Sequence, residues 1–76
     1  MMIYEHDRIV LTADVPEEDL FTGDVGTVVH IWKGGEAYEV EFFTLAGKTV
    51  TVATLTGDVV RPVLGSDRLH ARAVAA

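Results

Sequence analysis

One segment constrains the fold more than any other part of this chain: residues 23–31, which read Gly-Asp-Val-Gly-Thr-Val-Val-His-Ile. Glycine accepts backbone conformations that bend a chain, whereas valine, isoleucine and threonine favour extended strands. A shorter apolar run, residues 9–11, precedes this segment. A glycine turn that feeds a β-branched run in this way predicts the first half of a small, strongly bent β-barrel.

Alternating apolar and β-branched residues along the rest of the chain predict an all-β fold. The five predicted strands span residues 7–12, 25–32, 37–43, 48–55 and 59–63. The adjacent glycines within residues 33–36 predict a hairpin turn, and residues 45–48 predict another turn. Thr56-Gly57-Asp58 is typical of a single 3₁₀ turn.

The long connection at residues 13–23 is predicted to be an ordered loop. Pro16 lacks the N–H that a strand ladder needs, and the acidic residues that follow it have low strand propensity. Leu20 and Phe21 are large and apolar, so we expect both to fold back and cap one end of the core.

The two-residue period of a strand decides which side chains face the core. In the third strand, Glu39 and Glu41 share one face, and burying two unpaired carboxylates would cost free energy. We therefore expect the opposite face of this strand, with Tyr38, Val40 and Phe42, to point inward.

The same alternation orients the other strands. It predicts that Ile9, Leu11, Val50 and Val52 point inward and that Val10, Thr49, Thr51 and Ala53 point outward. In the second strand, Val28, Val29 and Ile31 cannot all share one face without a β-bulge. Gly26 is the position at which we expect that strand to bend.

A chain of 76 residues is long enough for one small domain. We divide it into an N-terminal extension at residues 1–6, a barrel at residues 7–63 and a C-terminal tail at residues 64–76. In the tail, Ser66 can cap a short helix whose apolar stripe contains Leu69 and Ala73. Such a helix is too short to be stable alone, so it either docks on the barrel or frays.

The chain contains no cysteine, which excludes disulfides, thiolate metal sites and a cysteine nucleophile. The first residues lack the basic segment and the apolar region of a signal peptide. No apolar run approaches the roughly 20 residues of a membrane span. We therefore predict a cytoplasmic protein with no membrane partner.

The chain is acidic, with a formal net charge of −6 and a pI of about 4.7. Affinity for nucleic acid comes largely from lysine and arginine on phosphates, and the six basic residues here are scattered along the chain. The charge therefore disfavours nucleic acid. It favours either simple solvation or attraction of a basic protein partner.

The titratable residues form no recognisable catalytic motif. Glu39 and Glu41 face the same way, as paired acid–base or cation-binding carboxylates do, but a solvated strand face explains them more simply. His6, His30 and His70 lack zinc-ligand spacing, and His30 is interpreted as a packing histidine or a partner contact. We predict no catalytic residue, no cofactor and no metal site. The alternative is a metal or enzyme site built on the two glutamates and a histidine.

Five short strands, a long first loop and a 3₁₀-like turn before the last strand resemble an SH3-like barrel. Residues 23–29 resemble the glycine-centred turn of KOW modules. The overall order is similar to the barrels of the nitrile hydratase β-subunit and of the ferredoxin–thioredoxin reductase variable subunit. The chain also resembles a small bacterial family, domain of unknown function 4926. The stretches that carry this resemblance are residues 7–12, 15–18, 23–30, 37–43 and 59–63. It implies a fold and assigns no activity.

Two departures limit what the resemblance implies about ligands. KOW modules that bind RNA usually carry basic residues around the glycine turn, but Asp24 and Thr27 stand there in this chain and the first lysine is Lys33. SH3 domains hold proline-rich peptides in an aromatic groove, whereas Tyr38 and Phe42 are assigned here to the core. Both departures argue against these ligands.

Several apolar residues remain on the predicted outer side, and contiguous exposed apolar surface often marks an interaction site. The predicted interaction residues are Val10, Trp32, Glu39, Glu41, Phe43 and Ala53. The alternative cover for this patch is the tail, through Leu69, Ala73 and Val74. We therefore expect a non-catalytic protein-binding module, in the manner of an accessory or antitoxin-like subunit, whose partner is another protein or a second copy. The alternative is a KOW-like nucleic-acid-binding module.

Overall fold

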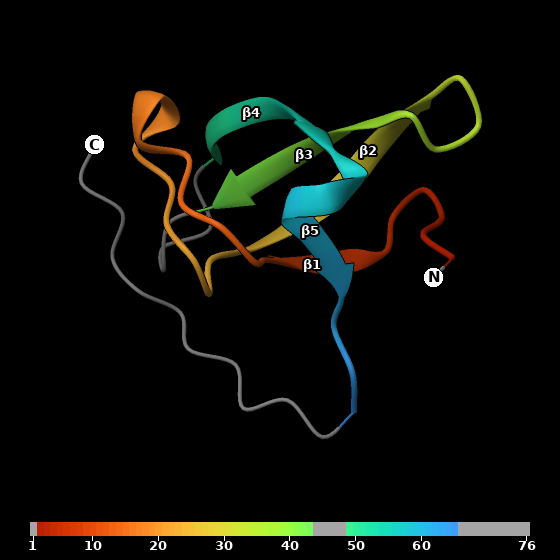
Figure 1. The fold of residues 1–76 in the computed structure, drawn as a ribbon, viewed down its shortest axis with the longest axis horizontal. Helices are drawn as coiled ribbons and strands as arrows, with labels where there is room; N and C mark the ends of the chain where they lie inside the picture. Colours follow the sequence, from red (N-terminus) through yellow and green to blue (C-terminus); the bar gives the residue numbers. More distant parts are fainter. Residues whose placement is uncertain (1, 44–48, 66–76) are drawn as a thin grey trace.

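The computed structural model describes residues 2–43 and 49–65 of the chain. Its elements are β1 (Arg8–Leu11), η1 (Pro16–Glu18), β2 (Val25–Trp32), β3 (Ala37–Phe43), β4 (Thr49–Thr56), η2 (Gly57–Val59) and β5 (Val60–Pro62), where η marks a 3₁₀ turn (Figure 1). Each predicted strand is confirmed to within one residue at either end, and the predicted 3₁₀ turn is η2. The predicted turn at 45–48 and the predicted tail helix lie outside the described residues.

The five strands form one antiparallel sheet in the order β4-β3-β2-β1-β5, which confirms the all-β class. β2 serves two partners, because its first residues pair with β1 and nearly its whole length pairs with β3. The β2–β3–β4 part and the β1–β5 part are turned relative to each other (Figure 1). This bent sheet is consistent with the SH3-like barrel that the sequence resembles.

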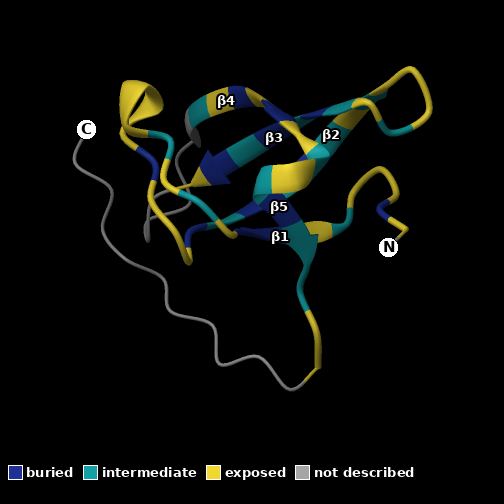
Figure 2. Ribbon diagram, in the orientation of Figure 1, coloured by how far each residue is buried: buried dark blue, intermediate teal, exposed yellow. Residues whose placement is uncertain are grey.

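The core lies on the inner side of the bent sheet. Val28, Val40 and Ala53 lie opposite one another on β2, β3 and β4, and all three are buried. The remaining members of the core are Ile3, Ile9, Leu11, Leu20, Tyr38, Phe42, Leu55 and Val60 (Figure 2). The predicted inward faces of the first and third strands are therefore confirmed.

β2 brings both Val28 and Ile31 to the inner side, although they are three positions apart, an odd spacing that regular alternation would place on opposite faces. The pairing with β3 shifts by one residue between Val28 and His30, which makes Val29 the extra residue of a β-bulge. The expected bulge is present. It lies at Val29 and not at Gly26, where the bend was predicted.

Gly26 serves close packing between two strands. A Cβ atom at this position would lie 2.5 Å from Val40 Cγ1 and 2.9 Å from the carbonyl oxygen of Glu41. Carbon atoms in favourable contact stay about 3.5–4.0 Å apart. Only glycine therefore fits here without moving β3.

The orientation of β4 is opposite to the prediction. Ala53 is buried, with 2% of its surface exposed, whereas Val52 is 49% exposed. Ala53 lies opposite Val40, which points into the core, and Val52 lies opposite Glu41, which points outward. The predictions that Val52 faces inward and Ala53 outward are therefore wrong, because a slip of one residue reverses every side chain of a strand.

The cause of this reversal lies at the start of β4. Phe42 pairs with Thr51 but Phe43 pairs with Thr49, so the register shifts by one residue at this point. Val50 is therefore the extra residue at this shift, and alternation counted from it does not fix the directions of the residues that follow. Thr51, which was predicted to point outward, lies opposite the inward-facing Phe42.

The loop between β1 and β2 closes one end of the core. Leu20 is completely buried, and its carbonyl oxygen accepts a hydrogen bond from the Val15 N–H at 2.8 Å. Phe21 is 38% exposed, so only the first of the two predicted capping residues enters the core. Asp24 is buried beside them, and its Oδ2 accepts a hydrogen bond from the Phe21 N–H at 2.9 Å.

The N-terminal extension also contributes to the core. Ile3 is buried within it, and the backbone N–H of His6 donates a hydrogen bond to the carbonyl oxygen of Val28 at 2.7 Å. Within the described ranges, none of the helical segments is long and apolar enough to cross a bilayer.

Candidate interaction surface

The side of the β2–β3–β4 sheet that faces away from the core carries most of the predicted interaction residues. The pairing registers place its residues in three rows across the strands: Thr27, Glu41 and Val52; His30, Glu39 and Thr54; and Trp32, Ala37 and Thr56. We call these nine residues the outer face. None of them is buried, because the inner face of the same strands supplies the core.

Four of the six predicted interaction residues are accessible on this side of the sheet. Trp32 is 46% exposed, and Phe43, at the end of β3, is 40% exposed. Glu39 and Glu41 are half-buried on the outer face between them. These four residues therefore lie on two neighbouring strands: Trp32 at the end of β2, and Glu39, Glu41 and Phe43 on β3.

The other two predicted residues are not accessible. Ala53 is on the core side of β4, for the reason given above. Val10 does lie outside the core cluster, but only 8% of its surface is exposed. It sits in the middle of the sheet, with Val25 opposite it on β2 and Arg61 opposite it on β5. Neighbours on both sides cover a side chain at such a position.

Sequence reasoning missed Val52 and the partnership between His30 and Trp32. The rings of His30 and Trp32 are 4.4 Å apart between centroids and meet edge to face at 77°. Both residues are exposed, which favours the interpretation of His30 as a surface contact rather than as a core histidine. Their spacing of two residues on one strand is the signal that predicts such a contact.

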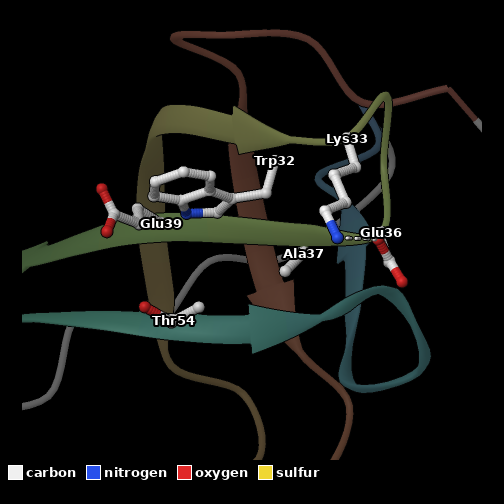
Figure 3. A pocket seen from close by; sticks show the side chains of 6 residues that line it. All are labelled: Trp32, Lys33, Glu36, Ala37, Glu39 and Thr54. Atoms are coloured by element: carbon white, nitrogen blue, oxygen red, sulfur yellow. Dashed lines mark ion pairs between the residues drawn. The ribbon is translucent and has the colours of Figure 1, made fainter.

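An open groove lies beside Trp32 at the end of the β2–β3 hairpin. Its volume is about 390 Å³, and it is lined by Trp32, Lys33, Glu36, Ala37, Glu39 and Thr54. The indole of Trp32 lies along β3 and reaches towards Glu39 (Figure 3). Ala37 and the indole give the groove an apolar floor and wall, and the carboxylates stand at its rim.

The hairpin turn holds the groove residues in place. The carbonyl oxygen of Trp32 accepts hydrogen bonds from the N–H groups of Gly35 and Glu36, at 3.1 and 3.0 Å. Lys33, Gly34 and Gly35 all have positive φ angles, which confirms that adjacent glycines form this turn. Lys33 Nζ lies 3.9 Å from Glu36 Oε2, so these two exposed charges offset each other.

The groove therefore retains one carboxylate, Glu39, without an ion-pair partner among the described residues. In the same part of the chain, no three or more histidine, aspartate or glutamate side chains are grouped closely enough to hold a metal ion. The groove thus joins an exposed indole to one carboxylate, an arrangement that can hold a cationic side chain.

A family model described as Domain of unknown function (DUF4926) matches residues 5–62, which is more than half of the chain. Searches of curated proteins and of solved structures give no significant match. The matched range contains β1 to β5 and the whole outer face. The chain therefore belongs to the DUF4926 family of domains of unknown function.

Proposed function

We propose that this chain is a non-catalytic protein-binding domain that uses the groove beside Trp32 to hold a basic side chain of another protein. The observation that carries the proposal is an indole, 46% exposed, that reaches towards the Glu39 carboxylate across an open groove (Figure 3). The proposed setting is a cytoplasmic accessory or antitoxin-like subunit.

The lining of the groove suits lysine or arginine. The face of an indole attracts a cation, and a carboxylate accepts charge-assisted hydrogen bonds from it. Ala37 adds apolar surface against which the methylene stem of a long basic side chain can pack. Tryptophan is also among the side chains that contribute most to protein–protein affinity.

The charge of the whole chain supports the same class of partner. The net charge of −6 attracts basic segments over a distance and speeds their encounter with the groove. Lys33 Nζ lies 3.9 Å from Glu36 Oε2, so Glu39 is the groove carboxylate that has no ion-pair partner among the described residues and can meet an incoming cation.

Trp32 makes this proposal measurable, because it is the one tryptophan of the chain. The probe is a short end-blocked peptide with arginine at alternate positions, and the matched probe replaces arginine with uncharged citrulline. We expect a saturable change in tryptophan emission with the arginine peptide, weaker at high salt. The absence of a saturable change with arginine, or equal changes with both peptides, overturns the proposal.

A pair of variants tests the groove itself. Glu39→Gln is expected to weaken binding of the arginine peptide by about threefold to tenfold, since it removes the charge beside the indole. Glu17→Gln makes the same charge change in η1, outside the outer face, and is expected to change affinity by less than about twofold. Equal losses in both variants indicate attraction by net charge alone and contradict a specific groove.

The nucleic-acid alternative has weaker support. Glu39 and Glu41 lie on the same face as Trp32, and their carboxylates repel phosphate groups. Salt-sensitive binding of RNA or DNA at near-physiological ionic strength, unaffected by Trp32→Ala, is the result that would favour a KOW-like function.

A further inference from the structure

The two edges of the sheet differ in how they are protected. β5, at one edge, has three residues and includes Arg61 and Pro62. Short length, charge and proline are the features by which proteins prevent an edge strand from pairing with another chain. The β5 edge is therefore blocked.

β4, at the other edge, has none of these features. It has eight residues, Thr-Val-Thr-Val-Ala-Thr-Leu-Thr, with no charge, no proline and no glycine. β-branched residues dominate it, and they favour extended pairing. It pairs with β3 on one side, and no strand within residues 2–43 and 49–65 pairs with its other side.

Within residues 2–43 and 49–65, no backbone group forms a hydrogen bond with the side of β4 that faces away from β3. In an antiparallel ladder, about half of the residues of an edge strand direct their N–H and C=O groups away from the neighbouring strand. Such a row is a template for another extended strand. Next to it, Val52 is 49% exposed on the outer face.

We propose that the free edge of β4 pairs antiparallel with β4 of a second copy of this chain, so that the two sheets join into one. A twofold axis perpendicular to the sheet keeps both outer faces on the same side and places residues of equal parity opposite each other. The axis passes beside Val52, which then lies opposite Val52 of the second copy. This is the register that covers the exposed valine.

The composition of β4 favours a second copy as the occupant. A twofold pairing places the residue at its centre opposite its own copy, so a charge there would repel itself, and β4 carries no charge at any position. Opposed β-branched and threonine pairs are favourable across strands.

The net charge of −6 per chain opposes the approach of two copies, so this dimer is expected to be strengthened by salt. Binding of a basic peptide in the groove has the opposite salt dependence, which separates the two proposals.

Cross-linking tests the register. The chain contains no cysteine, so Val52→Cys introduces a single thiol, which in this register lies opposite its own copy within the reach of a disulfide. Thr54→Cys is the matched control, because its two copies are about 13 Å apart along the paired strands. We expect the first variant to form a disulfide-linked dimer on mild oxidation and the second to remain largely uncrosslinked. Equal cross-linking of both variants overturns the register.

A charged substitution at the centre of the proposed pairing tests it without a cross-link. By sedimentation equilibrium at concentrations up to about 1 mM, the unmodified chain is expected to dimerise, more strongly at 0.5 M than at about 0.05 M salt. Val52→Lys is expected to raise the dissociation constant at least about tenfold. Val52→Thr keeps an uncharged β-branched residue and is expected to retain the dimer. Circular dichroism confirms that each variant is folded.

Two results overturn the proposal whatever the variants do. One is a chain that stays monomeric at every concentration and salt level. The other is slow amide hydrogen exchange along the free side of β4 that does not depend on concentration, since it means that the edge is covered within a single chain.

Discussion

The two faces of the β2–β3–β4 sheet are made by the same strands, but one packs in the core and the other meets solvent. On the inner side, Val28, Val40 and Ala53 are buried in one row, where volume and polarity are fixed by the neighbours. On the outer side, Trp32 and Val52 are about half exposed, and solvent accepts many side chains at their positions. The inner face therefore accounts for the fold, whereas the outer face can change its side chains at little cost in stability.

The largest expected effect comes from two adjacent phenylalanines that lie on opposite sides. Phe42 is 1% exposed and Phe43 is 40% exposed. Phe42→Ala is expected to lower the free energy of unfolding by about 3–5 kcal/mol, because it leaves a cavity in the core. Phe43→Ala is expected to lower it by less than about 1 kcal/mol. Urea unfolding followed by circular dichroism measures both.

A domain of this size has little stability to spare, so Phe42→Ala can unfold the chain altogether. Phe42→Leu, with an expected loss of about 1–2 kcal/mol, then replaces it. Losses of the same size at the two positions would remove the distinction between the faces.

A second test uses one replacement at two neighbouring positions of β4. Ala53→Thr adds volume and a hydroxyl group to the core and is expected to cost about 1–3 kcal/mol of stability. Val52→Thr keeps the shape of an exposed side chain and is expected to cost less than about 0.5 kcal/mol. Thermal and urea unfolding rank the variants, and the reverse ranking would support the orientation that alternation alone predicted.

The smallest effect concerns the loop that brings Leu20 to the inner side. Asp14 Oδ1 accepts hydrogen bonds from the Thr22 N–H at 2.8 Å and from its hydroxyl at 2.9 Å. The backbone bond first, and then the hydroxyl bond, hold the pKa of Asp14 below its ordinary value of 3.8. A lowered carboxyl pKa stabilises the folded state above the ordinary pKa, and this contribution is lost as the pH falls through the folded-state pKa.

Asp14→Asn tests this contact. The unmodified chain is expected to be slightly more stable than the variant at pH 7, and this gap is expected to narrow as the pH falls below about 3.8. Urea unfolding in a pH series measures the gap, with Glu17→Gln as an exposed acid outside the contact. A gap that does not change with pH would contradict a role for the ionised carboxylate.

The predictability of each strand from sequence depended on whether one of its faces contained a residue that cannot be buried. In β3, Glu39 and Glu41 decided the matter, since two carboxylates exclude one face from the core. In β4 both faces are free of charge, so alternation could not choose between Val52 and Ala53. The choice is made by the one-residue register shift after Phe42, which depends on pairing between strands.

The candidate surface was predictable to a similar degree. Trp32 could be placed because it ends a strand beside a glycine turn, where a large side chain is rarely enclosed. The accessibility of Val10 could not be predicted. Its outward direction is as predicted, but its burial depends on β2 and β5, which pair with β1 on either side. The contact of His30 with Trp32 follows from their spacing, yet the groove depends on how the hairpin folds over β3.

Gly26 has a consequence for recognising distant relatives of this chain. Since β3 passes where its side chain would be, any chain that retains this strand crossing needs glycine at the equivalent place, whatever its surface has become. A larger residue aligned with this position therefore indicates either an error of register or a change in how β2 and β3 pack. The position is thus a stringent single-site criterion for extending the family beyond overall sequence similarity.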